Sequence, residues 1–297
     1  MIIDIQHLIW NELPEVTSFT HKLPEVLDSQ DLSEAFIIAP NSCSPPPEWI
    51  SWVNEWSHAV LRSPGIALVQ ANPDVSDEQL RRQYAVISRT LGILNDRYGY
   101  FFDVKDQGLD YTKSPVPVSK TNAETSFHTD STAKVYFPDV VGLLCIHPAA
   151  TGGDSLVTNA AGAYHHLLGH HPMALNALSQ PLYRDVITPG STYDLEAIRN
   201  NAFPIFSSDS NGLLFRYMRY WVERAYEKLE LPLAQEITDG MNAVDAHFHQ
   251  PENQIQFRME RGAMLFVNNR FLCHNRTAFS SSNPPRTLVR TWINWSS

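Results

Sequence analysis

The chain has 297 residues, of which 43% are hydrophobic and 18% charged, a composition that indicates a folded globular protein and excludes wholesale disorder. The formal net charge is −10, and no run of Lys or Arg is longer than Arg81-Arg82. A nucleic-acid surface needs clustered positive charge, so we expect no nucleic-acid partner. The N-terminus is too polar for a signal peptide and no apolar run reaches about eighteen residues, so we expect no membrane segment and a cytoplasmic location.

The three cysteines, Cys43, Cys145 and Cys273, lie far apart in the chain. They lack the Cys-x-x-Cys spacing that is typical of zinc and redox sites. We therefore expect reduced, mostly buried thiols in a cytosolic protein.

Residues 1–60 are expected to form a helical or irregular extension that packs on the rest of the chain. Within them, Trp49, Trp52 and Trp56 recur at helical spacing, which predicts a helix over residues 48–59 with its aromatic face in the core. Beyond the extension, the patterns predict a strand at 65–70, a helix from Ser76 to Gly92, a strand at 98–104 and a loop at 108–124.

The first stretch with clear chemical character is Phe127-His128-Thr129-Asp130. In an extended chain, side chains two positions apart point to the same face, so His128 and Asp130 are expected to form a metal pincer. An imidazole and a carboxylate supply two ligands of the 2-His-1-carboxylate triad that holds non-haem Fe(II). Taken alone, a His-x-Asp pattern is weak evidence, because three-residue patterns occur often by chance.

The middle of the chain contains a predicted buried strand at 140–147, a tight Gly-Gly turn at 151–154 and a strand at 155–158. Asn159 is expected to cap the next helix. The histidines in and near this helix could form a second metal site, but Gly169 is expected to interrupt the helix. Surface or helix-end positions are therefore expected for His165, His166, His170 and His171, and likewise for His247 and His249.

The C-terminal half is predicted to contain more strands than helices. Its segments are strands at 181–187 and 203–219 with a hairpin turn at 208–212, helices at 221–228 and 233–247, and strands at 255–260, 263–267 and 287–293.

A third ligand for the pincer is available near the far end of the chain. His274 follows a strongly apolar strand and is itself followed by Arg286 and Arg290. The pincer and His274 must meet in space to bind one ion, which antiparallel Greek-key pairing permits. We find no repeat or linker, so residues 1–297 are expected to form one domain, mainly β with flanking helices, on a double-stranded β-helix (jelly-roll) core.

These motifs resemble those of the Fe(II)/2-oxoglutarate-dependent oxygenases of the taurine dioxygenase and clavaminate synthase type, over roughly residues 60 to 295. The stretch from His128 to Ser155 is also similar to γ-butyrobetaine hydroxylase. Four motifs in the same order carry the resemblance: Phe127-His128-Thr129-Asp130, Thr151-Gly152-Gly153-Asp154-Ser155, the run from Asn268 to Phe279, and Arg286 with Arg290.

The resemblance implies a role for each matching residue. His128, Asp130 and His274 would bind Fe(II), and Arg286 would pair with the far carboxylate of 2-oxoglutarate, a task that suits a planar, permanently charged guanidinium. Ser155 stands where the family usually has a Thr that shares this carboxylate. Arg290, four residues on along a strand, is expected on the face of Arg286, where it would support the clamp or hold an anionic group of the substrate.

The implied reaction converts 2-oxoglutarate and O₂ to succinate and CO₂ while a small-molecule substrate is oxidised. Halogenases of the wider superfamily lack the carboxylate at the position of Asp130, so its presence favours hydroxylation, desaturation or ring closure. Arg216 and Arg219 lie in a region that lines the substrate pocket in similar enzymes. A substrate carboxylate on one of them would fit an amino-acid-like or carboxylated metabolite.

Two other functions remain open from the residues. The same His-Asp-His set serves a zinc hydrolase, in which bound water is the nucleophile, although Arg286 has no evident use there. A non-catalytic barrel that binds a small molecule is the other alternative. The oligomeric state is not indicated by the sequence.

Overall fold

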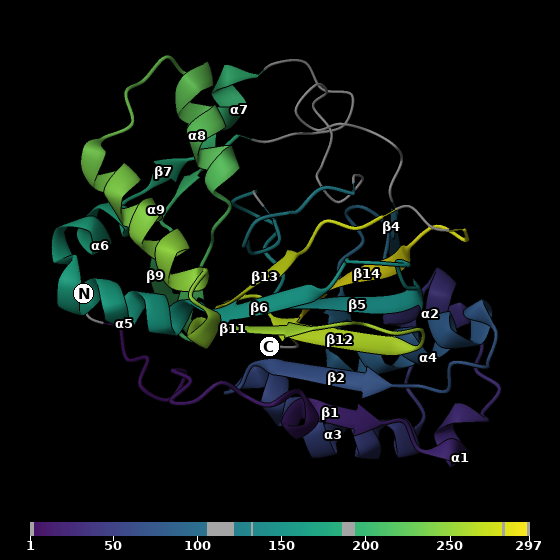
Figure 1. Cartoon of the computed structure of the whole chain (residues 1–297). Coiled ribbons are helices and arrows are strands. Elements are labelled where there is room, and N and C mark those ends of the chain that lie inside the picture. The colour runs from purple at the N-terminus through teal and green to yellow at the C-terminus, as the bar shows by residue number, and fades with distance from the viewer. Residues whose placement is uncertain (1–2, 106–121, 132, 186–193, 281–282, 296–297) are drawn as a thin grey trace.

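The computed structural model describes residues 3–105, 122–131, 133–185, 194–280 and 283–295. The predicted loop at 108–124 therefore lies mostly outside the described residues, as does the end of the predicted strand at 181–187. Within the described residues, two β-sheets form the centre and helices surround them (Figure 1).

The large sheet has seven strands in the order β1-β2-β12-β5-β14-β3, with β4 also paired to β14. All its pairs are antiparallel except β1 with β2. The small sheet has the antiparallel order β11-β6-β13. The strands are β1 (Thr20–Lys22), β2 (Ile66–Gln70), β3 (Ile93–Leu94), β4 (Phe102–Lys105), β5 (Val140–His147), β6 (Ser155–Asn159), β11 (Gln254–Phe257), β12 (Ala263–Asn268), β13 (Leu272–Arg276) and β14 (Thr287–Asn294).

The helices fall into two groups (Figure 1). Four lie toward the large sheet, with β1 and β2 at its edge: α1 (Glu25–Asp28), α2 (Ala35–Ile38), α3 (Pro47–Leu61) and α4 (Asp77–Leu91). The others gather at one end of the small sheet: α5 (Ala160–His170), α6 (Pro172–Leu178), α7 (Leu195–Asn200), α8 (Arg219–Lys228) and α9 (Gln235–Phe248). Near them are two short antiparallel pairs, β7 (Leu182–Tyr183) with β8 (Ala202–Phe203) and β9 (Phe206–Asp209) with β10 (Gly212–Phe215). Single 3₁₀ turns cover Val16–Phe19, Pro40–Ser42 and Pro251–Asn253.

The two faces of the large sheet belong to two different hydrophobic clusters, because side chains alternate along a strand. In β12, Leu265 and Val267 pack with residues of the small sheet, such as Leu272 of β13. Between them in the sequence, Met264 and Phe266 pack with side chains of α3 and α4. The space between the sheets is thus filled by one face of β12, β5 and β14, and the helices cover the other.

Most predicted elements are confirmed. The helix with Trp49 and Trp56 is α3, in which both rings are buried. The oxygen of Ser76 accepts from Gln79 N at 3.1 Å and caps α4, which ends before Gly92, and Asn159 caps α5. The mainly sheet-based architecture with flanking helices is confirmed as well.

Three local predictions are wrong. Gly169 does not interrupt its helix, because α5 continues to His170; one glycine costs only about 1 kcal/mol in a helix, which packing offsets. The strand predicted at 98–104 begins at Phe102, and the one predicted to reach Arg219 ends at Phe215 before α8. Strand β13 was not predicted, because its Cys-His-Asn-Arg residues lack an apolar alternation.

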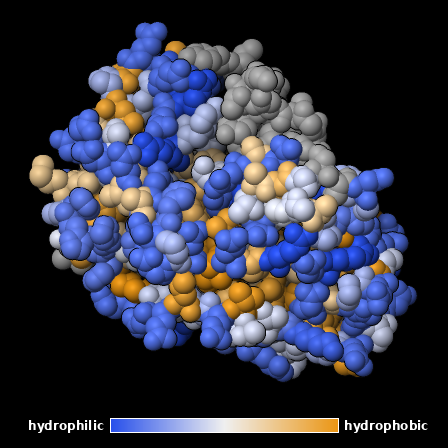
Figure 2. All heavy atoms as spheres, in the orientation of Figure 1, coloured by the Kyte–Doolittle hydropathy of each residue, from blue (hydrophilic) through white to orange (hydrophobic). Residues whose placement is uncertain are grey.

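The visible face of the molecule is mainly hydrophilic, with small apolar areas between polar ones (Figure 2). Among the described residues, no helix combines the length and the apolar character that crossing a membrane requires.

Candidate metal centre

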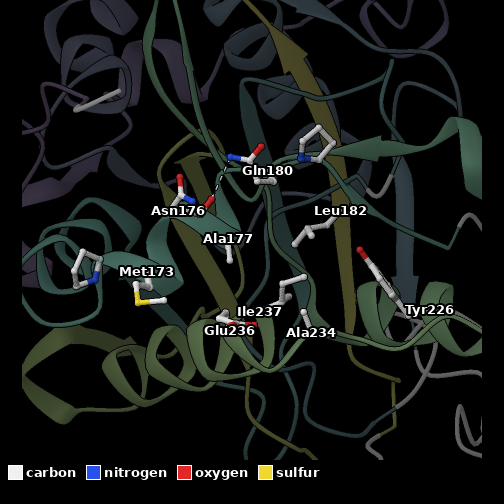
Figure 3. A pocket seen from close by; sticks show the side chains of 11 residues that line it. Met173, Asn176, Ala177, Gln180, Leu182, Tyr226, Ala234, Glu236 and Ile237 are labelled. Carbon is white, nitrogen blue, oxygen red and sulfur yellow. Dashed lines mark hydrogen bonds between the residues drawn. The ribbon is translucent and has the colours of Figure 1, made fainter.

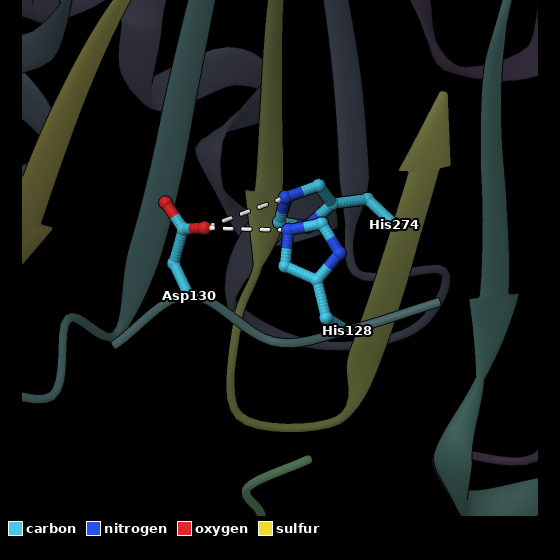
Figure 4. Close-up of side chains that lie close together, drawn as sticks. All are labelled: His128, Asp130 and His274. Carbon is cyan, nitrogen blue, oxygen red and sulfur yellow. Dashed lines mark ion pairs between the residues drawn. The ribbon is translucent and has the colours of Figure 1, made fainter. Parts of the chain in front are cut away.

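His128 and His274 are brought together by the backbone. His128 N donates to His274 O at 3.1 Å and His274 N donates to His128 O at 3.0 Å, so the two residues form a hydrogen-bonded antiparallel pair. Residues that oppose each other in such a pair project to the same face, and Asp130 follows two positions on. Strand β13, held by β6 on its other side, therefore places the three side chains together (Figure 4).

The three side chains offer one ligand atom each, and these atoms lie within 4.8 Å of one another. Asp130 Oδ1 is 3.7 Å from His128 Nε2 and 3.6 Å from His274 Nε2. Both separations are too long for hydrogen bonds. They are close to the roughly 3–3.5 Å between two donors that share one ion at about 2.1 Å, so the donor set fits a transition metal. Among the described residues this is the one such group.

The tautomer of His128 suits a ligand. Its Nδ1 lies 2.9 Å from the carbonyl oxygen of Ser126, and a carbonyl can only accept, so Nδ1 carries the ring proton. The lone pair of Nε2 then faces Asp130, an arrangement common among metal-binding histidines. Burial, with the nearby His274, lowers the pKa of His128 to about 4, so the ring is neutral at physiological pH.

The two oxygens of Asp130 have different environments. Oδ1 faces the two imidazoles, whereas Oδ2 accepts from Trp292 Nε1 at 2.6 Å and from Arg290 Nη1 at 3.2 Å. Burial opposes ionisation of this carboxyl, but the charge of Arg290 and the contacts with the histidines outweigh it and lower the pKa below its usual range. Asp130 is therefore an anion that presents one oxygen to the metal position.

The backbone of Asp130 is clamped by a buried amide. Asp130 N donates to Asn269 Oδ1 at 2.7 Å, and Asn269 Nδ2 donates to Asp130 O at 3.2 Å and Pro138 O at 3.0 Å. Sequence reasoning missed both Asn269 and Trp292. The available signal for Trp292 was its position two residues after Arg290 in a strand, which puts it on the same face.

Arg286 lies just before β14 and is only 5% exposed. Its Nη2 reaches Gly153 O at 3.5 Å, and its guanidinium lies 5.1 Å from the centre of the Phe279 ring. Burial lowers its pKa to about 10, so it stays charged at neutral pH. Among the described residues this cation has no ion-pair partner, and such a buried charge is a ready anion site. Ser155, at the start of β6 and two residues from Gly153, is also buried.

The Gly152-Gly153 turn has the unusual backbone angles that its sequence predicts, with φ of 68° and 74°. A Cβ on Gly152 would lie 2.2 Å from Ala278 O, and one on Gly153 would lie 3.0 Å from Arg286 Nε. The turn therefore needs glycine both for its conformation and for the close approach of Arg286.

The remaining predicted residues lie in different settings. Arg290 is on β14, on the face that also carries Trp292, and pairs with Asp130. Arg216 is buried against the Phe203 ring at 3.7 Å and donates to the carbonyls of Ala133 and Lys134. Arg219 lies on α8 at the surface, 2.7 Å from Glu223 and 2.9 Å from Asp245. The structure thus places Arg216 and Arg219 in two different surroundings and not side by side in one site.

A hollow of about 590 Å³ lies elsewhere, between α6 and α9 (Figure 3). Its walls include Met173, Leu182, Tyr226 and Ile237, and none of its lining residues belongs to the metal centre. Hollow size alone therefore does not locate the chemistry in this chain.

The sequence profile described as "Taurine catabolism dioxygenase TauD, TfdA family" matches residues 32–292. The chain belongs to this family. The matched range contains the whole metal centre, Arg286 and Arg290, so the likeness that the motifs indicated is confirmed.

Individual proteins resemble this TauD/TfdA-family chain at low sequence identity. FR-33289 synthase of Streptomyces rubellomurinus is 28% identical over 183 residues, covering 59% of this chain and 51% of that protein. The mitochondrial trimethyllysine dioxygenase of Rattus norvegicus is 24% identical over 224 residues, covering 73% and 49%. The chain thus spans about half the length of these curated relatives.

Solved structures share the fold over nearly the full length. An asparagine oxygenase in complex with Fe(II), 3-hydroxyasparagine and succinate superposes with a TM-score of 0.64 at 18% identity, covering 93% of each chain. The non-haem iron oxygenase OrfP, in complex with Fe and α-ketoglutaric acid, gives a TM-score of 0.62 at 14% identity, covering 93% and 94%. At these identities the likeness concerns the fold.

Proposed function

We propose that the chain is an Fe(II)/2-oxoglutarate-dependent dioxygenase that oxidises a small amino-acid-like or carboxylated metabolite. The observation that carries this proposal is that the chain has both a group of three metal-ligand side chains and Arg286, a buried guanidinium with no ion-pair partner among the described residues. A metal centre alone suits many reactions. A metal centre with a built anion site suits a reaction that needs a dicarboxylate co-substrate.

His128, Asp130 and His274 would hold Fe(II), which, when bound, supplies the activation of O₂ and the oxidative decarboxylation of 2-oxoglutarate to succinate and CO₂. The side chains of His128 and Asp130 are already in states that suit metal binding. His128 offers a neutral Nε2, and Asp130 offers one oxygen because Trp292 and Arg290 occupy the other. Three ligands on one face leave the remaining positions of the ion for co-substrate and oxygen.

Arg286 would bind the far carboxylate of 2-oxoglutarate, and Ser155 would donate its hydroxyl to the same group. The guanidinium is held against Gly153 and the Phe279 ring, which fixes its plane before the co-substrate arrives. Burial strengthens the resulting ion pair, because little water competes for either partner.

The substrate class rests on likeness and on charge. The solved relatives include complexes with 3-hydroxyasparagine and hydroxyarginine, and one curated relative is a trimethyllysine dioxygenase. An amino-acid-like substrate has a carboxylate, for which Arg290, beside the metal position, is the first candidate and Arg216 and Arg219 are others. Retention of Asp130 favours hydroxylation, or desaturation or ring closure, over halogenation.

The remaining expectations belong to the same proposal. The two facing sheets would form a double-stranded β-helix core within one domain, and the protein would act in the cytoplasm. A zinc hydrolase or a non-catalytic barrel is less well supported, since neither gives Arg286 a function.

The test is conversion of 2-oxoglutarate to succinate by the full chain with Fe(II), ascorbate and O₂. We expect slow turnover without substrate, its loss in His274→Ala, and an increase of about 10- to 100-fold in the KM for 2-oxoglutarate in Arg286→Ala, since charged hydrogen bonds contribute about 1.5–3 kcal/mol. Arg224→Ala is the matched control, because Arg224 is exposed and pairs with Glu227. Absence of succinate in every metal-loaded sample, even with amino acids present, would refute the proposal.

A further inference from the structure

Helices α5 and α9 contact each other (Figure 1). The two helices carry a group of histidines that are not part of the catalytic set. The ring centre of His166 lies 4.8 Å from that of His170, 5.5 Å from that of His247 and 5.7 Å from that of His171. We propose that His166, His170 and His247 form a second metal site, which binds a Zn²⁺-class ion and joins α5 to α9.

His166 lies between the other two histidines and has a ring contact with each of them. His166 and His170 are four residues apart on α5, which continues through Gly169, so they share one helical face. His247 comes from α9 and points its Nε2 at the same face: a Cβ on Gly162 would lie 3.1 Å from it. Gly162 is one further turn along this face, and its missing side chain makes room for the His247 ring.

The spacing of the rings suits a shared ion. Two imidazoles bound to one tetrahedral ion through nitrogens at about 2.0–2.1 Å have their ring centres about 5 Å apart. The observed 4.8 and 5.5 Å lie on either side of this value. Among the described residues, only the catalytic group has its ligand atoms close enough together to hold an ion as they stand, so binding at the second site requires side-chain rotation. His170 is exposed and His166 is only partly buried, which leaves both free to turn.

The surroundings favour a cation over protonated rings. Burial and the neighbouring His170 and His171 lower the pKa of His166, and burial with His166 nearby lowers that of His247 to about 4. The rings of His166 and His247 are thus neutral bases at physiological pH. A second hollow, also of about 590 Å³ and separate from the one between α6 and α9, is lined by the three histidines and by Glu12 and Glu252. One contact must change: metal binding at Nε2 puts the ring proton of His247 on Nδ1, so the Asn253 amide nitrogen 3.3 Å away has to turn.

Imidazole ligands select borderline ions such as Zn²⁺, Ni²⁺ and Cu²⁺, whereas the catalytic set has a carboxylate and suits Fe²⁺. Ion binding at the second site would stabilise the packing of α5 on α9 without taking part in oxidation. Zinc found in the purified protein would then be no evidence for a hydrolase, because it has a site of its own.

The test is calorimetric titration of the metal-free full chain with Zn²⁺. We expect two zinc ions per chain in the unmodified protein, loss of one in His166→Ala/His247→Ala, and loss of the other in His128→Ala/His274→Ala. His165→Ala is the matched control, since His165 lines the same hollow from the exposed side of α5 and should leave both ions bound. Thermal unfolding verifies that each variant is folded.

His170→Ala covers the case in which the double variant fails to fold, because His170 is exposed. It should lower the zinc affinity of the proposed second site by about tenfold or more and leave the affinity of the catalytic site unchanged. Retention of both ions at full affinity in His166→Ala/His247→Ala or in His170→Ala would overturn the second site. A single ion lost only with His128→Ala/His274→Ala would also overturn it, and a single ion lost only with His166→Ala/His247→Ala would support it while contradicting the catalytic centre.

Discussion

Asp130, a proposed metal ligand, has two carboxylate oxygens with different partners. Oδ1 faces His128 and His274, while Oδ2 is bound by the indole N–H of Trp292 and by Arg290. A carboxylate fixed in this way binds a metal through one oxygen and leaves more positions open. Partners of this kind orient a ligand, and their removal typically costs about 10- to 100-fold in metal affinity or activity.

We therefore expect Trp292→Phe to weaken Fe²⁺ binding by about tenfold, because the ring stays in the core while the donor to Asp130 is lost. Anaerobic equilibrium titration with Fe²⁺ measures the effect. Trp295→Phe is the control: the indole N–H of Trp295 is buried without a hydrogen-bond partner among the described residues, so its removal should leave metal affinity unchanged. Equal affinities in Trp292→Phe and the unmodified chain would show that this hydrogen bond does not position the ligand.

At the residue scale, the sequence predicts the ligands but not what orients them. The pairing of His128 with Asp130 follows from a period of two, and this was visible in four consecutive letters. The Trp292 contact joins positions 162 apart, and the Asn269 contact joins positions 139 apart. Such hydrogen bonds depend on strand order and register, which no local pattern contains.

The Gly152-Gly153 turn shows how a backbone element serves the site. Both residues have positive φ, and Gly153 lies directly against Arg286. A side chain at Gly153 would be destabilising for two reasons: the backbone is left-handed, and the Arg286 guanidinium lies too close.

We expect Gly153→Ala to lower the free energy of unfolding by about 1–2 kcal/mol, the usual cost of left-handed backbone for other residues. It should also raise the KM for 2-oxoglutarate, since the added methyl displaces Arg286. Denaturant unfolding and the succinate assay measure the two effects. Gly212→Ala provides the comparison: it has φ of 95° but open space around it, so it should destabilise without changing the KM. A KM in Gly153→Ala equal to that in Gly212→Ala would contradict this account of the turn.

The contact of α5 with α9 predicts a pH effect on stability. His247 faces His166 of α5 and Glu252 of the following 3₁₀ turn, and burial, the larger cause, lowers its pKa to about 4. The unfolded chain binds a proton at about pH 6.5, whereas the folded chain resists it until about pH 4. Stability is therefore fully present above pH 6.5 and is lost as the pH falls toward 4.

In metal-free protein, His247→Gln should flatten the decline in the free energy of unfolding between about pH 6.5 and 4. Urea unfolding at a series of pH values in this window measures the slope. The exposed His165→Gln should keep the slope of the unmodified chain. Identical slopes for His247→Gln and the unmodified chain would mean that His247 titrates alike in both states.

At the element scale, helices and strands with a regular sequence pattern were predicted well. Elements whose polar residues are buried through distant contacts were not. Strongly apolar strands such as β5 and β12, and capped helices such as α4, follow from periodicity and capping alone. Strand β13 did not, because its Asn275 and Arg276 are polar yet buried through contacts with Thr125, Glu124 and other distant groups. The continuation of α5 through Gly169 was not predicted for a related reason, since tertiary packing overrides helix propensity.

At the scale of the whole molecule, the metal centre joins distant parts of the chain. His128 and Asp130 lie on a segment held through His274 of β13, Asn269 after β12 and the backbone of Tyr217. A ligand that binds the folded state alone stabilises it, by about 2.7 kcal/mol when its concentration is a hundredfold above Kd.

Addition of 2-oxoglutarate to the anaerobic Fe²⁺-loaded chain should therefore raise Tm by several degrees, since 1 kcal/mol is worth about 2–4 °C in a domain of this size. Differential scanning calorimetry measures the shift. His274→Ala and Arg286→Ala should lose the shift, because one lacks a proposed iron ligand and the other the proposed partner of the co-substrate carboxylate, while Arg224→Ala should keep it. A shift that persists in Arg286→Ala would place the co-substrate elsewhere.

The broad architecture was predictable because the pattern of many short strands, with ligands in both halves of the chain, favours antiparallel pairing. The parallel β1–β2 pair and the strand order were not, since they are set by long-range packing of the two sheets. Substrate identity belongs to the same class of property, since it depends on side chains gathered from separate elements.

Anomalous diffraction at the iron edge, from crystals grown anaerobically with Fe²⁺ and 2-oxoglutarate, tests the central claim most directly. We predict an iron peak about 2.0–2.3 Å from His128 Nε2, Asp130 Oδ1 and His274 Nε2, with the far carboxylate of 2-oxoglutarate on Arg286. An iron position away from these three atoms, or 2-oxoglutarate bound without contact to Arg286, would contradict the account.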